Sequence, residues 1–274
     1  MSALTLTLAD SSAGALDLGS LSPATLRGLK PTALRRLRLP AGNRQVPLAD
    51  LFEISGDDPT TLRLHGLNAA CHRVGRGLRE GRIEVKGRVG DELGREMRGG
   101  EIRVSGHAGD GTGMGMLGGY LHIDGSVGDA LGGISPGATR GMNGGVLVVA
   151  GNAGARCGER MRRGFVVVGG DVGEYLGDRM LAGSIVVFGR TGAHAGFGMR
   201  RGTLLLAHAP QVPDAGYSDC GEFELGILTL MRQYLASFHP TFARRLVAFN
   251  RARRWCGDMA YGGKGEILVA AGGA

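Results

Sequence analysis

The chain has 274 residues, of which 43% are hydrophobic, and its 32 Lys and Arg against 25 Asp and Glu give a net charge of +7. This hydrophobic content excludes a disordered chain, and the 52 glycines follow no strict three-residue period, which excludes collagen. The four cysteines form no C-x-x-C pair, which argues against a zinc ribbon or a dense disulfide framework. Without an apolar leader or a run of about 18 apolar residues, we expect a cytoplasmic protein that does not enter a membrane.

Residues 1–60 mix short strand-like stretches with the segment "SPATLRGL", in which Ser22 and Pro23 have the chemistry of a helix N-cap and a first turn. We interpret this region as a small cap, because a stack of repeats must protect the open edge at its first strand. The next segment, "LRLHGLNAACHRVGRGLREG" from Leu62, is interpreted as a degenerate first repeat.

Residues 61–209 carry a repeat of nineteen residues. The stretch "GRIEVKGRVGDELGREMRGG" begins at Gly81, and "GEIRVSGHAGDGTGMGMLGG" begins nineteen residues later at Gly100. The later copies align once an insertion, about Gly133 to Thr139, is set aside. Three glycine columns and one methionine column then recur: Gly87, Gly106, Gly125, Gly151, Gly170 and Gly189; Gly90, Gly109, Gly128, Gly154, Gly173 and Gly192; Gly94, Gly113, Gly132, Gly158, Gly177 and Gly196; and Met97, Met116, Met142, Met161, Met180 and Met199.

Each repeat opens with a short aliphatic strand and continues with a glycine every three or four residues, without a helical stretch. This pattern predicts an all-β solenoid: a single-stack β-helix of coils of about nineteen residues, with a small N-terminal cap and a C-terminal helical extension. Glycine would provide turns with positive φ and let coils approach to about 4.8 Å. We expect the methionines to point inward as core side chains.

Alternation along the strands predicts which side chains face the core. Two columns should face inward, and the residues between them should face outward. The outward residues are polar in the early repeats but apolar in the later ones, where they are Val148, Val167, Val186 and Leu205. We expect this apolar face to be covered, either by the C-terminal segment or by docking another subunit.

Residues 210–274 form the predicted C-terminal extension. Within it, residues 222–256 have apolar side chains at helical spacing and one interruption at Pro240, which predicts two helices. The segment "ARRLVAFNRARRW" would place several arginines on the second helix. It lacks the spaced aromatic residues of proteins that bind single-stranded nucleic acid, so we do not expect a nucleic-acid partner.

The stretch "GDGTGMGMLGG", residues 109–119, contains the G-x-G-x-x-G spacing of a dinucleotide-binding loop. A strand-like segment follows it where such a loop requires a helix, so we interpret its glycines as part of the repeat, which leaves Gly111 and Gly115 unexplained. The seven histidines show no metal-ligand spacing, and Cys157 occupies a column of leucines. We therefore expect no catalytic, cofactor-binding or metal-binding residue on this chain.

Arginines are better organised than the other polar residues. Five of them follow the column methionines directly or by one position, so that stacking would align them along one corner: Arg98, Arg162, Arg163, Arg200 and Arg201. A ladder of guanidinium groups suits a chain of carboxylates or phosphates. A solvated edge that keeps the protein soluble explains the same residues equally well.

With these columns in place, the sequence resembles the C subunit of formylmethanofuran dehydrogenase and its bacterial relative, the C subunit of the formyltransferase/hydrolase complex of methylotrophs. The resemblance includes "VPLADLFEISGD", "RGMNGG", "MLAGSIVVFG" and "GFGMRRGTLLL". The glycine columns are also similar to the C-terminal β-helix domain of glutamate synthase, but the flanking segments favour the C subunits.

The resemblance implies a non-catalytic scaffold subunit. In such complexes a metal-dependent amidohydrolase-like subunit and a formyltransferase subunit move a formyl group between tetrahydromethanopterin and a methanofuran-like carrier. The bacterial version releases formate and so serves formaldehyde oxidation. The arginine ladder would then hold the polyglutamyl tail of the carrier. Two alternatives stay open: a methanogen-type formylmethanofuran dehydrogenase, and a stand-alone solenoid acyltransferase, although those enzymes have hexapeptide repeats.

Overall fold

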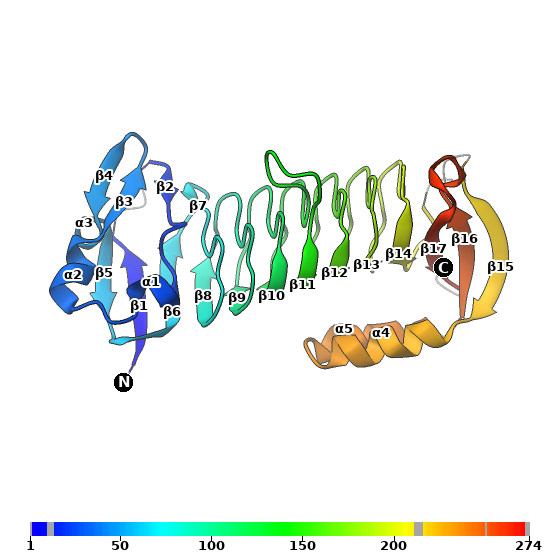
Figure 1. Cartoon of the computed structure of the whole chain (residues 1–274). Coiled ribbons are helices and arrows are strands. Elements are labelled where there is room, and N and C mark those ends of the chain that lie inside the picture. The colour runs from blue at the N-terminus through cyan, green and yellow to red at the C-terminus, as the bar shows by residue number, and fades with distance from the viewer. Residues whose placement is uncertain (1, 10–13, 211–215, 250, 272–274) are drawn as a thin grey trace.

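The computed structural model describes residues 2–9, 14–210, 216–249 and 251–271. Most of the chain is β-structure, and one sheet of 13 strands runs the length of an elongated molecule, in the order β15-β16-β17-β14-β13-β12-β11-β10-β9-β8-β6-β1-β5 (Figure 1). The repeats contribute its parallel strands: β6 (Asp58–Leu67), β8 (Arg82–Gly87), β9 (Glu101–Val104), β10 (Leu117–Ile123), β11 (Asn143–Val149), β12 (Arg163–Val168), β13 (Ser184–Val187) and β14 (Arg201–Leu206).

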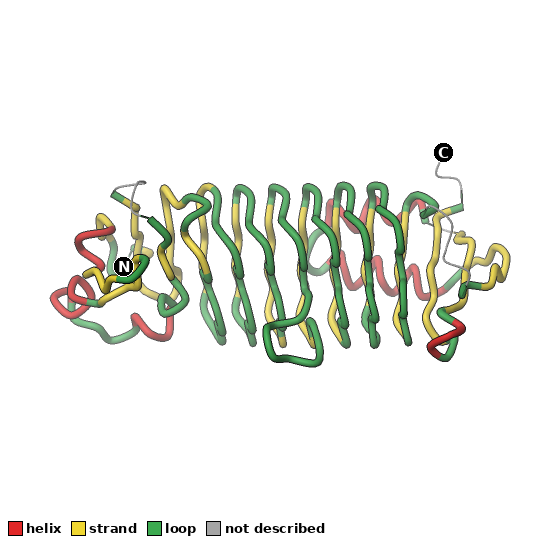
Figure 2. Tube along the Cα trace, turned by 90° about the horizontal axis from the view of Figure 1, so that it is seen from above, coloured by secondary structure: helices red, strands yellow, loops and turns green. Residues whose placement is uncertain are grey.

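Neighbouring strands pair in the register that the repeat predicts. Ile83 lies beside Ile102, and Ile102 lies beside Leu121. Between strands the chain returns through turns that also stack, as the view from above shows (Figure 2). This arrangement, with one sheet strand in each repeat and few helices, is β-helix-like.

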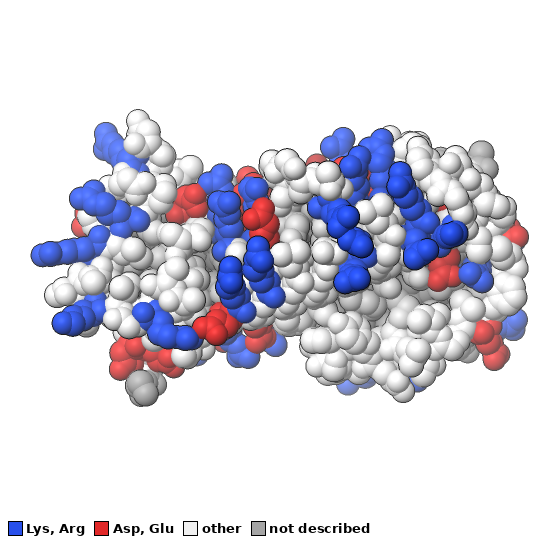
Figure 3. Space-filling model, in the orientation of Figure 1, with Lys and Arg blue, Asp and Glu red and all other residues white. Residues whose placement is uncertain are grey.

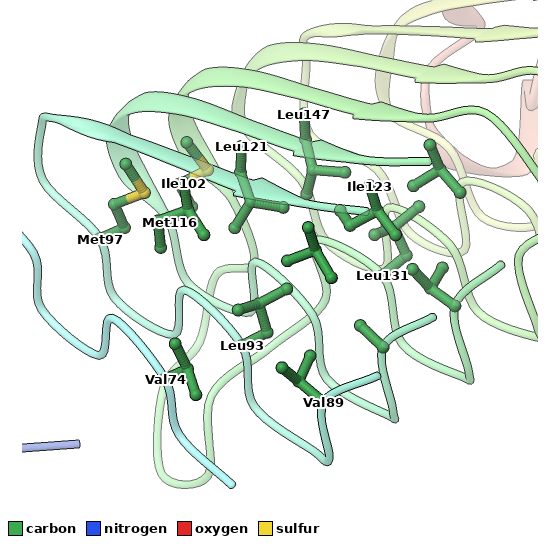
Figure 4. Close-up of a cluster of buried hydrophobic side chains, with 14 of the residues drawn as sticks. Val74, Val89, Leu93, Met97, Ile102, Met116, Leu121, Ile123, Leu131 and Leu147 are labelled. Carbon is green, nitrogen blue, oxygen red and sulfur yellow. The ribbon is translucent and has the colours of Figure 1, made fainter. Parts of the chain in front are cut away.

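The inward columns form one continuous core (Figure 4). The six column methionines are fully buried, as predicted. Each one packs against a glycine two strands further along the sheet than the strand of its own repeat: Met97 Cε would lie 2.6 Å from a Cβ added at Gly119, and Met116 Cε 2.7 Å from one at Gly145. A larger residue at these glycines would therefore displace a buried methionine.

The turns explain the two glycines that the repeat left over. Except in the turn that carries the insertion, the turns have positive φ at three alternate positions, and in the stretch in question these are Gly111 (φ 67°), Gly113 (φ 66°) and Gly115 (φ 63°). The neighbouring repeat fills the outer two positions with Glu92 (φ 61°) and Glu96 (φ 57°). Gly111 and Gly115 therefore occupy left-handed positions that the repeat requires, although not always as glycine.

Side chains on the turns link successive coils. The Asp91 carboxylate accepts a hydrogen bond from the Asp110 amide (3.0 Å), and the Asp110 carboxylate accepts one from the Asp129 amide (2.8 Å). His72 and His107 use Nδ1 in the same way, accepting from the amides of Asp91 and Ser126. These bonds satisfy turn amides that the main sheet does not reach.

The N-terminal region closes one end of the stack. In the main sheet, β1 (Ala3–Leu8) pairs parallel with β6 and antiparallel with β5 (Phe52–Ser55). A second sheet joins β4 (Arg44–Pro47), β3 (Arg38–Ala41), β2 (Leu16–Asp17) and β7 (Cys71–His72) on the turn side. The N-terminal region also contains three short helices: α1 (Pro23–Leu26), α2 (Pro31–Arg36) and α3 (Leu48–Leu51). Ser22 caps α1 and Pro23 starts it, as predicted.

The C-terminal region is only partly helical. The two predicted helices are present as α4 (Gly226–Ala236) and α5 (Pro240–Arg245), and a short 3-10 turn, η1 (Leu246–Ala248), follows them. The prediction of helix from 251 to 256 is wrong, because β16 (Arg251–Gly257) lies there between β15 (Ser218–Glu224) and β17 (Lys264–Ala270). A second 3-10 turn, η2 (Met259–Tyr261), joins β16 to β17. β17 pairs parallel with β14 and continues the main sheet. The backbone N–H and C=O groups at the edge of β14 are therefore hydrogen-bonded by another strand rather than covered by a helix.

Helices α4 and α5 cover the apolar outer face of the later repeats (Figure 1). Val148, Val167, Val186 and Leu205 are fully buried there and share a cluster with Leu228, Met231 and Leu235 of α4 and Phe242 of α5. The sequence allowed two covers for this apolar face, the C-terminal segment or another subunit, and in the structure the chain's own helices cover it. The expectation that these four side chains dock another subunit is corrected accordingly, because they are not accessible.

Candidate functional site

The strongest candidate site is a corner of the stack where arginines from several repeats meet. Its centre is a cavity of about 230 Å³, lined by Thr139, Arg140, Arg160, Arg179, Leu181, Gly198, Arg200 and Tyr261. A neighbouring cavity of about 460 Å³ is lined by Arg98, Glu96, Leu117, Ser135 and Asn143, and also by Thr139 and Arg140. We call the two together the arginine corner.

The structure brings together some of the five predicted arginines. Arg200 lines the smaller cavity and Arg98 the larger one, whereas Arg162, Arg163 and Arg201 line neither of these two. Arg140, Arg160 and Arg179 complete the corner. Arg160 and Arg179 directly precede column methionines, a position that predicts them at this corner, although they were not among the five candidate contact residues; Arg140 was not predicted.

Backbone geometry fixes these arginines. Arg160 and Arg179 occupy the third left-handed position of their turns, each with φ 49°. The Arg160 amide donates to the carbonyl of Asp178 (2.8 Å), and the Arg200 amide donates to the carbonyl of Met180 (2.8 Å). Successive coils therefore hold the backbone of these arginines at the spacing of the repeat, so their side chains leave the stack from the same corner.

The insertion after Leu131 forms a ridge beside the corner, where it protrudes between β10 and β11 (Figure 1). Its Ser135 is buried and packs against Gly115, where an added Cβ would lie 2.7 Å from Ser135 Oγ. Glycine at 115 therefore makes room for the insertion, which explains why a non-glycine residue is not used in this repeat. Thr139 and Arg140, at the end of the insertion, line both cavities.

The arginines of the corner differ electrostatically from those of the early repeats. Several arginines of the early repeats are paired: Arg73 lies 2.9 Å from Glu92, and Arg82 forms an ion pair with Glu101 at 2.6 Å. In the part of the chain that the structure describes, Arg140, Arg160 and Arg200 have no acidic partner within 4.0 Å, and Arg179 approaches only Asp178, at 3.8 Å. The corner thus presents positive charge that the fold does not neutralise (Figure 3).

An adjoining cavity of about 370 Å³ contains the buried carboxyl of Asp178, with Arg156, Glu159 and Tyr175. Burial raises the pKa of Asp178, and the nearby Arg179, Arg156 and Arg160 oppose this increase. Among the described residues no group of three or more His, Cys, Asp or Glu side chains could hold a metal ion. Burial also raises the pKa of Cys157 to about 12, which makes its thiol a poor nucleophile.

Guanidinium groups from neighbouring coils can form charge-assisted, bidentate hydrogen bonds with carboxylates or phosphates, and Tyr261 adds an aromatic side chain to the lining. The arginine corner could therefore bind an anion. The described helices include none long and apolar enough to cross a membrane.

Comparison with known proteins agrees with this architecture. A model of the GXGXG motif family matches residues 61–214. The C subunit of the formyltransferase/hydrolase complex of Methylorubrum extorquens is 38% identical over 78 residues, an alignment that spans 28% of this chain and 29% of that relative. A chain in the crystal structure of the same organism's formyltransferase/hydrolase complex with methylofuran is 37% identical, with a TM-score of 0.90, and the match covers 97% of this chain and 99% of that one.

Proposed function

Because the chain belongs to the GXGXG motif family and matches a chain of a formyltransferase/hydrolase complex along almost its whole length, we propose that it is the C subunit of such a complex. The observation that carries this proposal is the structural match, at 37% identity over 97% of the chain. An alignment of that extent includes the N-terminal cap and the C-terminal strands, not only the glycine columns of the repeats.

In this role the chain is a non-catalytic scaffold. Its partners are an amidohydrolase-like subunit, which holds the metal, and a formyltransferase subunit. The complex works in the cytoplasm, where it transfers the formyl group from tetrahydromethanopterin to a methanofuran-like carrier and then releases it from the carrier as formate by hydrolysis. The fold suits a scaffold, because a stack of coils joined by buried methionines and turn hydrogen bonds is a rigid, elongated support. For the same reason we infer that the stack is a single β-solenoid.

We further propose that the arginine corner holds the polyglutamyl tail of the carrier. A chain of carboxylates is the polyanion that matches guanidinium groups at repeat spacing, and the unpaired arginines of the corner supply the charge. The solved complex that this chain resembles contains methylofuran. Because that complex is bacterial, it favours the formate-releasing complex over a methanogen-type formylmethanofuran dehydrogenase.

Affinity purification of the tagged chain from its native host tests the scaffold role. We expect formyltransferase and amidohydrolase-like subunits to co-purify in fixed ratio, and the assembled complex to release formate. A chain that purifies alone as an active homo-oligomer would contradict the proposal.

The carrier site is tested by the double charge reversal Arg160→Glu and Arg200→Glu, with binding of a fluorescent oligoglutamate to the complex as readout. We expect at least a tenfold loss of affinity and a weaker salt dependence, because both arginines are unpaired in the structure. The matched control is Arg63→Glu, which removes a surface arginine already paired with Glu84 at 3.0 Å. Unchanged binding of oligoglutamate by the double variant would show that the arginine corner is not the carrier site.

A further inference from the structure

Helix α4 is apolar on two faces, of which one packs against the sheet and the other is largely exposed. Leu228, Met231 and Leu235 face the sheet and are buried. On the other side lies a second apolar row, which we call the α4 stripe: Ile227, Leu230, Tyr234 and the nearby Phe238 are 45%, 60%, 47% and 37% exposed. The spacing of three and four residues places these side chains on one side of the helix.

The contacts of the fold account for part of the α4 stripe, since Phe238 stacks on Tyr120 of β10 with ring centroids 5.7 Å apart, but they leave Ile227 and Leu230 exposed. The helix is already held to the sheet by its inner row and by α5, where Phe242 stacks on Phe188 with ring centroids 5.4 Å apart. Tyr234 also leans against Phe165 and Phe238, but Leu230 remains the most exposed large apolar side chain among the described residues. Isolated exposed leucines are ordinary, whereas an aligned row on one helix face marks an interaction surface.

Charge indicates what kind of surface covers the α4 stripe. From Leu225 to Phe249 the sequence has no Asp or Glu, while it has Arg232, Arg244 and Arg245, of which Arg245 lies over the Phe188 ring at 4.1 Å and so belongs to the contact with the sheet. In the space-filling view the helices form a largely uncharged lobe on the same face as a cluster of basic residues (Figure 3). A second copy of the chain would oppose arginine to arginine across a symmetric interface. A different protein with an apolar patch bordered by carboxylates meets no such repulsion.

We propose that the α4 stripe is the surface by which this chain docks another subunit of its complex, and that the docking patch of that subunit is apolar with an acidic rim. This inference rests on the proposed scaffold function and names the surface that performs it. The helices thus bury the apolar sheet face predicted from the sequence and present a new apolar face of their own.

The test is assembly of purified chain with the formyltransferase and amidohydrolase-like subunits, measured by native mass spectrometry and by titration. Leu230→Glu should weaken assembly at least tenfold, because it buries a carboxylate against an acidic rim. Leu230→Arg should weaken it less, since arginine can pair with that rim. Leu29→Glu, at an apolar residue of the N-terminal cap that is 38% exposed, is the matched control and should assemble normally. Circular dichroism should show that all three variants fold.

The outcomes separate the two proposals. If wild-type chain assembles and Leu230→Glu assembles equally well, the α4 stripe is not the docking surface although the scaffold function stands. If Leu230→Glu assembles normally with the other subunits but fails to form a homodimer that the wild-type chain forms, the occupant is a second copy and the inference is overturned. If the variant assembles normally but loses binding to anionic lipid vesicles, the occupant is a membrane and the inference is likewise overturned. If wild-type chain joins no subunit, both proposals fail.

Discussion

At the scale of single residues, positive φ is the property that most constrains this sequence. Three left-handed positions recur in the turns, except in the one that carries the insertion, and non-glycine residues such as Glu92, Arg156 and Tyr175 occupy some of them. The middle position is always glycine in the repeats, from Gly94 to Gly196. The difference is packing: the middle position faces the core, where an added Cβ at Gly113 would overlap Leu147.

Gly113→Ala should therefore destabilise the protein by about 2–5 kcal/mol, the sum of a left-handed backbone penalty and an overpacked core. Gly77→Ala is the matched control, since Gly77 has φ 65° but nothing within 4 Å of the added Cβ. It should cost only the backbone penalty, about 1–2 kcal/mol. Urea unfolding followed by circular dichroism measures both. Equal losses in the two variants would show that packing plays no part.

At the scale of elements, the contact between α5 and the sheet contains two histidines. His239 is the N-cap of α5 and accepts a hydrogen bond from the Phe242 amide through Nδ1 (3.3 Å). Its ring meets the ring of His122 on β10, with centroids 5.1 Å apart. Burial lowers the pKa of both histidines, and the positive charge of Arg103 lowers it further. The carboxylate of Asp124 opposes this decrease for both histidines, and Glu101 opposes it for His122.

Acidification should loosen the helical cover. Both histidines have folded-state pKa values below 6.5, so above that pH they are neutral in the docked and undocked states alike. As the pH falls from 6.5 toward the folded-state pKa values, the histidines of the undocked state take up protons first, so the free energy that favours docking of the helices decreases. Below the folded-state pKa values both states are protonated, and this free energy decreases no further.

Hydrogen exchange of residues 226–249 at pH 7.5 and pH 5.5, corrected for intrinsic rates, measures this effect. We expect weaker protection at the lower pH. The variant His239→Asn keeps an N-cap acceptor without a titrating group and should show a smaller change. A pH dependence as large in His239→Asn as in the natural sequence would exclude a contribution from this histidine.

At the scale of the whole molecule, a stack of parallel strands has two open edges and, in this protein, one apolar outer face. The N-terminal region covers one edge with β1 and β5, and the C-terminal region covers the other with β17, β16 and β15. The outer strand β15 is largely exposed and carries Asp219, Glu222 and Glu224. Charges on an edge strand discourage further pairing, so the sheet ends there.

Truncation after Pro210 should produce a chain that aggregates, because it exposes the edge of β14 together with Val148, Val167, Val186 and Leu205. Size-exclusion chromatography with light scattering measures the outcome. The same truncation with all four residues changed to threonine should aggregate less, since it exposes less apolar surface beside the strand edge. A monomeric truncated chain with intact β-structure would contradict the role given to the C-terminal region.

Much of the fold follows from the sequence because the repeat imposes the same local geometry many times. The strand register, the inward columns, the buried methionines and the two helices on either side of Pro240 were all predictable. The last strand was not predicted, although "GEILVAA" from Gly265 has the pattern that opens the repeats. A Cβ at Gly265 would lie 2.6 Å from Met199 Cε, the same packing as in the repeats.

The sequence by itself determined the repeat, because glycine, methionine and aliphatic columns constrain backbone conformation and burial within each coil. Only the tertiary structure decided which surfaces remain open. It joined Arg140 of the insertion to Arg160, Arg179 and Arg200 of other coils, and it turned the apolar sheet face inward beneath α4. The physical reason is that pairing of charges and covering of apolar faces depend on segments that meet only after the coils have stacked.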